Sequence, residues 1–167
     1  SGALPFTFIE TRLESKPAKK RASIEDTSVD TNRPLIPEHA EAISKYIMDN
    51  RDKNYILPPM TLNVQEDTNL YSFVTSALMR PGYLVIPATA KLAITDGQHR
   101  RKGINEALER LPSDQQKKLA ADSIAVMITC ETDIDQIHQD FADCSRTKPL
   151  PPSQLAVYDR RNPANKV

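Results

Sequence analysis

Several segments of the chain carry apolar side chains at the three- and four-residue spacing of an amphipathic helix. The predicted helices cover residues 37–49, 98–111 and 132–144, and a short fourth helix begins at Ser153. Pro37 suits a first helical turn, and Asp133 suits the first turn of the third helix because an acidic side chain there complements the helix dipole. Ile104, Leu108 and Leu111 are expected to be buried against a sheet.

Short apolar runs bounded by turn residues predict the strands. These strands cover Met60–Val64, two short stretches of 82–97 joined at Pro87–Ala90, a buried run over 123–130, and residues 4–13. Residues 65–80 fit a short helix and a strand equally well. Strands and helices interleave without an internal repeat, which predicts an α+β fold in which helices flank a mixed sheet.

Length and composition favour one main domain. The chain has 167 residues, of which 39% are hydrophobic, and this is enough for one compact core. Residues 14–33 are polar, with a basic cluster at Lys19, Lys20 and Arg21, and are predicted to be a linker. We therefore expect an N-terminal strand and linker, one domain and a short tail, with boundaries at 1–32, 33–159 and 160–167.

The charge and cysteine content exclude several classes of protein. Lys and Arg number 22, as do Asp and Glu, so any DNA binding must come from a local basic patch. Two cysteines are too few for a disulfide scaffold or a zinc site, and Cys130 and Cys144 are expected to be small core residues. No apolar run approaches the roughly 20 residues of a membrane span, so a cytoplasmic protein is expected.

The stretch TDGQHRRKG, residues 95–103, lies where a predicted strand turns directly into a helix. Such a turn leaves the first N–H groups of the helix unpaired, and Gly97 lets a phosphate come close. Four basic or titratable side chains occupy the first turn, namely His99, Arg100, Arg101 and Lys102. Cations at this end of the helix dipole cost a few tenths of a kcal/mol each unless an anion offsets them, so a phosphate site is predicted.

The individual side chains of this stretch have separate expected roles. Asp96 fits a helix N-cap and a ligand or Mg²⁺ contact equally well. His99, beside two arginines, is expected to be a neutral hydrogen-bonding imidazole. Arg100 returns to the turn and anchors the anion, whereas Arg101, about 100° further round the helix, points to DNA or solvent. Gly103 indicates close packing, because glycine inside a helix costs about 1 kcal/mol relative to alanine.

Two histidines outside this stretch have structural interpretations. His138 falls on the apolar side of its predicted helix and is expected to be a core or boundary residue. His39 is expected at the surface.

Residues 96–100 spell DGQHR, which resembles the signature of the DGQHR-domain family that includes the DndB proteins of DNA phosphorothioation. Two flanking segments agree with this family. Residues 41–62 resemble its helix followed by an LPP strand, and 141–155 resemble its segment in which Phe, Asp, Asn and Lys-Pro follow in that order, with Ser145 where Asn is usual. The likeness spans about Arg33 to Asp159. A wider likeness links the chain to the ParB and sulfiredoxin superfamily, whose G-x-x-R-x-x-small element is matched by Gly97, Arg100 and Gly103.

The resemblance implies a ParB-like fold and a DNA-binding negative regulator that works with other DNA-modification proteins. Thiol redox chemistry is not implied, because Gln98 stands where sulfiredoxin has its cysteine. The implied phosphate or nucleotide site comprises Gly97, Gln98, His99, Arg100, Arg146 and Lys148. The implied DNA contacts are Arg101, Lys102, Arg146 and Lys148. Full chains of the family are longer than this one, and a homo-oligomer is compatible with the sequence.

Three classes of function remain open. A DNA-binding regulator ranks first. An NTPase, or less readily a nuclease, ranks second: Asp96 would hold Mg²⁺, Gln98 or His99 would position water, and the cofactor would be ATP or CTP. A scaffold module whose DGQHR turn is only structural ranks third.

Overall fold

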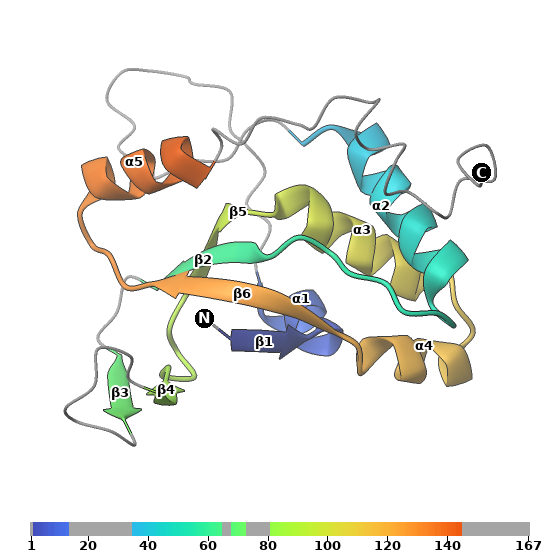
Figure 1. Ribbon diagram of the computed structural model, residues 1–167, viewed down its shortest axis with the longest axis horizontal. Helices are drawn as coiled ribbons and strands as arrows, with labels where there is room; N and C mark the ends of the chain where they lie inside the picture. Colours follow the sequence, from blue (N-terminus) through green and yellow to red (C-terminus); the bar gives the residue numbers. More distant parts are fainter. Residues whose placement is uncertain (1, 14–34, 65–67, 73–80, 145–167) are drawn as a thin grey trace, which may run out of the picture.

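The computed structural model describes residues 2–13, 35–64, 68–72 and 81–144. Within them the elements follow one another from β1 to α5 (Figure 1). They are β1 (Gly2–Pro5), α1 (Phe6–Arg12), α2 (Pro37–Asn50), β2 (Met60–Val64), β3 (Asn69–Ser72), β4 (Gly82–Val85), β5 (Leu92–Asp96), α3 (Gln98–Glu109), α4 (Ser113–Ala120), β6 (Ser123–Thr129) and α5 (Ile134–Cys144). The linker over 14–33, most of 65–80 and the helix expected at Ser153 lie outside the described residues.

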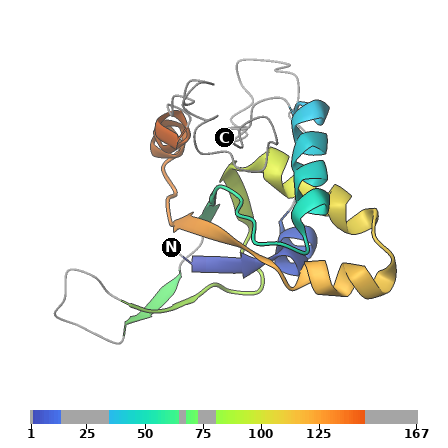
Figure 2. The ribbon, with the colours of Figure 1, turned by 45° about the vertical axis from the view of Figure 1, so that its right-hand side comes forward.

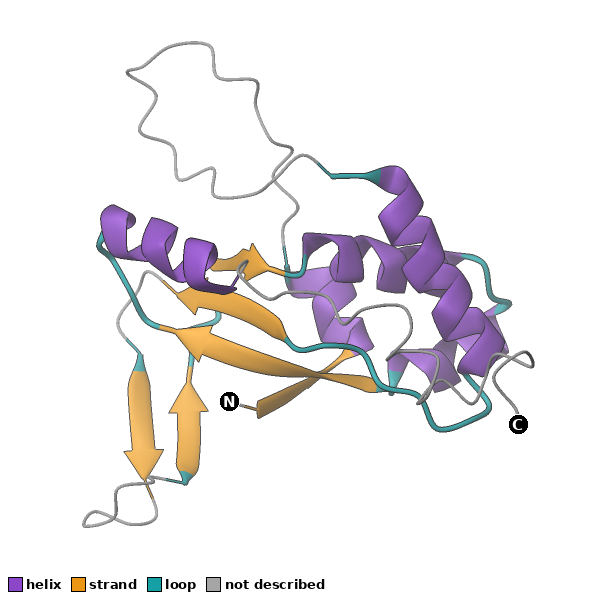
Figure 3. Ribbon diagram, turned by 45° about the horizontal axis from the view of Figure 1, so that its top comes forward, coloured by secondary structure: helices purple, strands orange, loops and turns teal. Residues whose placement is uncertain are grey.

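The main sheet has four strands in the order β1-β6-β2-β5. β2 pairs parallel with β6 and antiparallel with β5, while β1 pairs antiparallel with β6. The sheet is therefore mixed, and the α+β prediction is confirmed. β3 and β4 form a separate antiparallel ribbon at the edge of the molecule, on the far side of the sheet from α2, α3 and α4 (Figure 3).

Helices α1 to α4 gather on one side of the molecule, and α5 lies apart from them (Figure 2). The core joins the sheet to this helical group through buried side chains of α1, α2, β2, β5, α3, α4 and β6. The largest of these are Phe6, Ile9, Leu13, Ile47, Met60, Leu62, Ile104, Leu108 and Ile124. Burial of Ile104 and Leu108 confirms the prediction for α3, whereas Leu111 is only partly buried at the edge of this cluster.

Two predictions of secondary structure were wrong or incomplete. Residues 4–13 do not form one strand, because Phe6–Arg12 is helical. Phe6, Ile9 and Leu13 follow helical spacing and are all buried, so a helix places the three on one face. Helix α4 was not predicted, since Leu119 is its one buried side chain and supplies no apolar stripe.

Four residues expected in the core or at its boundary lie at the surface or are half-buried. β6 alternates between buried and exposed positions, so Met127 is exposed, and the strand is covered on one face only. Cys130 follows the end of β6 and is exposed, whereas Cys144 is half-buried. His138 is also exposed, because α5 buries the neighbouring Ile137 and a turn of about 100° carries the next side chain outward.

α2 and α3 pack closely and run in the same direction (Figure 1). A Cβ atom on Gly103 would lie 2.7 Å from Cβ of Ile43 and 2.8 Å from the carbonyl oxygen of Ala40. One turn earlier, His99 lies beside Ile36 and His39 at the start of α2. The expected close packing at Gly103 is therefore confirmed, and it places the N-termini of the two helices side by side.

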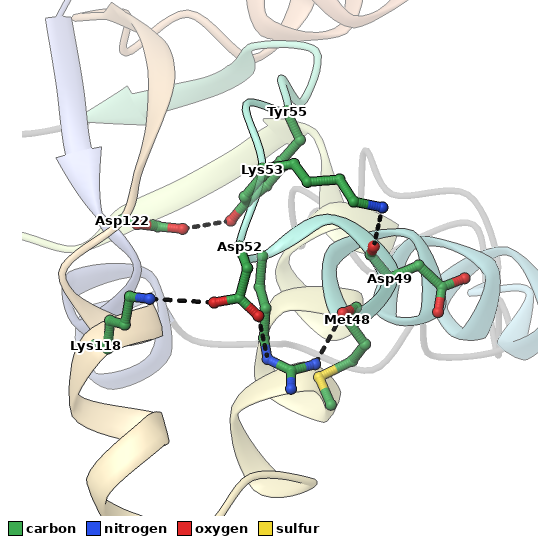
Figure 4. Close-up of polar contacts among 8 residues, drawn as sticks. Met48, Asp49, Asp52, Lys53, Tyr55, Lys118 and Asp122 are labelled. Carbon is green, nitrogen blue, oxygen red and sulfur yellow. Dashed lines mark hydrogen bonds and ion pairs between the residues drawn. The ribbon is translucent and has the colours of Figure 1, made fainter. Parts of the chain in front are cut away.

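Polar contacts fix the chain that leaves α2 (Figure 4). Lys118 of α4 pairs with Asp52 at 3.1 Å, and the Tyr55 hydroxyl donates a hydrogen bond of 2.7 Å to Asp122. Burial, followed by this hydrogen bond, raises the pKa of Tyr55, so the hydroxyl remains a donor. These contacts hold the segment that leads into β2 and its buried Met60.

Candidate functional site

The DGQHR stretch forms the junction between β5 and α3. β5 ends at Asp96, α3 begins at Gln98, and Gly97 between them has a φ of 116°, in the left-handed region that favours glycine. A Cβ atom on Gly97 would also lie 2.7 Å from Cγ of Met60. Conformation and space therefore both call for glycine at this turn.

Asp96 does not cap the helix. Gly97 is the N-cap residue, and no side chain caps α3. The interpretation of Asp96 as an N-cap is therefore wrong, and the first N–H groups of the helix receive no side-chain acceptor through capping.

Asp96 instead forms an ion pair with Arg100, one helical turn later. Nη2 of Arg100 donates to Oδ2 of Asp96. Nε of Arg100 lies close to the turn, 3.3 Å from where a Cβ atom on Gly97 would be, so this side chain returns to the turn as predicted. The Arg100 side chain is 18% exposed, whereas the Asp96 side chain is 42% exposed. Nε of Arg100 is buried and has no hydrogen-bond acceptor within the described part of the chain. The guanidinium is therefore held at the turn by a carboxylate that solvent reaches.

Arg101 is half-buried, and its Nε is also buried, with no acceptor in the ranges that the structure describes. Burial lowers the pKa of its guanidinium, although an arginine stays protonated at physiological pH. Nε of Arg101 therefore does not contact solvent, whereas the Arg101 side chain was expected to point towards DNA or solvent. Among the described residues, no carboxylate forms an ion pair with Arg101, so its desolvation is not offset there.

Lys102 lies on the outer side of α3. Its Nζ pairs with Oε1 of Glu106 at 2.9 Å, and Glu106 also faces Arg110 at 3.9 Å. Gln98 is half-buried in the first turn. Arg146 and Lys148 fall outside the described residues, so their expected approach to this turn stays a prediction.

His99 connects the turn to the start of α2. The Ile36 N–H donates a hydrogen bond of 2.9 Å to Nε2 of His99, and the His39 ring lies 5.4 Å from the His99 ring between centroids. Burial, followed by repulsion from His39 and Arg100, lowers the pKa of His99 below its ordinary value of 6.5, with Asp96 acting in the opposite sense. An Nε2 that accepts a hydrogen bond carries no proton, so the expected neutral imidazole agrees with the structure.

We expect stability to fall on mild acidification because of His99. Its pKa is lower in the folded state, so its contribution is complete above pH 6.5 and is lost as the pH falls from there towards the lowered value. Urea unfolding between pH 8 and pH 5 should show a smaller loss for His99→Asn than for the natural sequence. His138→Asn, which removes an exposed histidine, should leave the loss unchanged; an equal effect of both substitutions would contradict this role of His99.

Two participants in this site were missed by sequence reasoning. His39 was expected only at the surface, but its ring lies beside that of His99. Met60 was expected only in a strand, but its side chain leaves no room for a Cβ atom at position 97. No local signal identifies either, because both depend on how distant segments pack. The Asp96–Arg100 pair has a local signal in its spacing of four residues, although Asp96 ends β5 and only Arg100 lies on the helix.

The site therefore combines two adjacent helix N-termini, two arginine Nε atoms without acceptors, and a neutral histidine that joins the helices. The positive ends of both helix dipoles and the arginines make the local electrostatic potential positive, which is the condition that favours an anion. Among the described residues, no group of three or more His, Cys, Asp or Glu side chains gathers as a metal would require. No helix in the described ranges is long and apolar enough to cross a membrane.

Comparisons with known proteins identify the family. Searches of curated proteins and of solved structures returned no match. The comparison with protein families matched residues 3–167 to DndB, described as DNA-sulfur modification-associated. Because this match covers nearly the whole sequence and agrees with the DGQHR signature, the chain belongs to the DndB family of DNA-sulfur modification-associated proteins.

Proposed function

We propose that this chain is a DNA-binding regulator in a DNA sulfur modification system and that its DGQHR turn binds phosphate. The family supports the association with DNA modification. The observation that carries the phosphate site is the pair of buried Nε atoms of Arg100 and Arg101, which have no acceptor among the described residues. Both arginines belong to the start of a helix that no side chain caps. A phosphate oxygen is an acceptor of the right charge for both.

Arg101 and Arg100 enter this proposal differently. Arg101 has no ion-pair partner in the described part of the chain, so an incoming phosphate offsets a desolvation that is already present. Arg100 must first break its ion pair with Asp96 before its guanidinium can bind the ligand. Arg101 and Lys102 also contact the DNA backbone in this proposal, together with Arg146 and Lys148.

The proposed DNA contact rests on few phosphates, and salt dependence tests it. The logarithm of the binding constant is expected to fall with the logarithm of salt concentration at a slope of roughly −3 to −5, since each neutralised phosphate contributes about 0.9. Lys102→Ala should reduce the steepness by about 1, because it removes one such contact. Fluorescence anisotropy with labelled duplex DNA between low and moderate salt measures both values.

The matched control is Lys117→Ala, which removes an exposed lysine from α4 and should leave the slope unchanged. A slope near zero, or equal effects of the two lysine substitutions, would remove the DNA-backbone role assigned to α3.

A nucleotide site with Mg²⁺, and from it a weak NTPase, is the second candidate. The half-exposed carboxylate of Asp96 favours it, because a cation could draw Asp96 from Arg100 while Arg100 takes a phosphate. Mg²⁺ keeps waters and phosphate oxygens as ligands, so one protein carboxylate suffices. Water positioning falls to Gln98 here, since Nε2 of His99 already accepts the Ile36 N–H.

Thermal unfolding with ATP, CTP or GTP, each with and without Mg²⁺, separates these candidates. A ligand at 100 times its dissociation constant stabilises by about 2.7 kcal/mol, which is readily measured. Stabilisation that requires Mg²⁺, together with phosphate release that Asp96→Ala abolishes, supports the NTPase. DNA affinity that needs no nucleotide supports the regulator, and no response to either ligand leaves the turn as a structural element.

A further inference from the structure

The segment from Thr68 to Ala90 is unusual in its charge. Arg80 is its sole charged residue, although 26% of the whole chain is charged. The segment includes β3 and β4, which form the separate ribbon. Soluble proteins commonly protect exposed strand edges with charged side chains, and β3 and β4 contain none.

The ribbon exposes apolar and aromatic side chains on both faces. Tyr71 of β3 lies directly opposite Tyr83 of β4, and these side chains are 60% and 68% exposed. Val85 shares their face because it is two residues beyond Tyr83, while the exposed Leu84 lies on the other face. Figure 2 shows the ribbon at the edge of the molecule, away from the helical group. A two-stranded ribbon of this kind is marginally stable alone in water, so an added strand would stabilise it.

We propose that the β3–β4 ribbon is a self-association surface on which a second copy of this chain docks, β4 against β4 in antiparallel pairing. A two-fold axis that pairs the same strand of two copies makes those strands antiparallel. An uncharged strand meets its own copy without like-charge repulsion. Backbone DNA contacts need cations, and Arg80 is the sole cation between Thr68 and Ala90, so the ribbon suits a protein partner better than DNA.

The exposed area predicts a weak and reversible dimer. Each tyrosine offers up to roughly 200 Å², so the exposed parts of Tyr71 and Tyr83 supply about 250 Å² per copy. This is well below the roughly 800 Å² per partner of a standard stable interface. Tyrosine is enriched and charged residues are depleted at interface centres, which matches this surface.

Sedimentation equilibrium of the whole 167-residue chain tests the proposal. The average mass should rise from monomer towards dimer between roughly 10 μM and 1 mM, the range in which weak interfaces assemble. Tyr83→Glu and Tyr83→Lys should each weaken association about tenfold or more, because like charges then face each other across the axis. An equimolar mixture of the Tyr83→Glu and Tyr83→Lys variants should restore the dimer at low salt, because a glutamate of one copy then meets a lysine of the other. The two side chains lie on the same face, since the two-fold axis is perpendicular to the ribbon.

Ile56→Glu is the matched control, because Ile56 is 83% exposed but lies in the loop before β2. It should leave association unchanged. Unaltered circular dichroism and melting temperature of the Tyr83 variants show that they fold, and Tyr71→Glu repeats the test from β3. A natural chain that stays monomeric throughout, Tyr83 variants that associate as it does, or a mixture that stays monomeric would each overturn the proposal.

Discussion

Gly103→Ala is expected to lower the free energy of unfolding by about 2 kcal/mol, within the range for overpacked sites. The added Cβ atom would lie 2.7 Å from Cβ of Ile43 and 2.8 Å from the carbonyl oxygen of Ala40. Neither atom is the flexible end of a side chain, so α2 and α3 must move apart. The change should exceed the gain of about 1 kcal/mol that alanine brings to a helix interior. Urea unfolding followed by circular dichroism measures the difference.

Gly2→Ala is the control, because a Cβ atom on Gly2 would meet nothing within 4 Å. Its effect should stay within about 0.5 kcal/mol. If Gly103→Ala were instead stabilising, helix propensity would dominate and the close contact of α2 with α3 would be wrong. The same substitution should also weaken the bond between Ile36 and His99, which lies one turn away along the same helix pair.

The helices that were predicted well have one buried face and one exposed face. The helices α2 and α3 show this pattern over enough residues for the period to be clear. The strand over Met60–Val64 was also predicted from alternating apolar residues, but the structure buries all five of its residues, including the polar Thr61 and Asn63. The apolar run that contains α1 is too short for its period to be decided, and tertiary packing selects the helix there. α4 has no apolar stripe; Asp114 in its first turn and Lys117 and Lys118 in its last turn complement its dipole instead.

The candidate site was predicted in its local part only. The strand-to-helix turn, the special conformation of Gly97 and the inward return of Arg100 follow from a few consecutive residues. The contact between His39 and His99 depends on α2 packing beside α3. Local sequence patterns predict each helix but not which helices pack together. The ParB-like architecture stays a prediction, since the family match identifies DndB and the described fold is a mixed sheet with helices.

Asp96→Asn is expected to strengthen binding of inorganic pyrophosphate in the absence of Mg²⁺ by about 5- to 10-fold. The substitution removes the carboxylate that occupies Nη2 of Arg100 and leaves the guanidinium available to the ligand. This is less than the 1.5 to 3 kcal/mol of a full charge-assisted hydrogen bond, because asparagine still offers a neutral acceptor. In the presence of Mg²⁺ the sign should reverse for ATP, since a carboxylate that holds the cation is lost. Titration calorimetry measures both.

Two further variants separate the released arginine from a simple change of net charge. Glu106→Gln removes the same charge from α3, the helix that carries Arg100, but it frees Lys102 rather than Arg100, so it should alter pyrophosphate binding little. Adding Arg100→Lys to Asp96→Asn should cancel the gain, because a lysine cannot grip two phosphate oxygens at once, whereas the same lysine substitution alone should weaken binding by about 1 to 3 kcal/mol. Equal gains from Asp96→Asn and Glu106→Gln would mean that net charge, and not the Asp96–Arg100 pair, controls the site. A gain that survives Arg100→Lys would transfer the anchor to Arg101, whose Nε is also buried without an acceptor among the described residues.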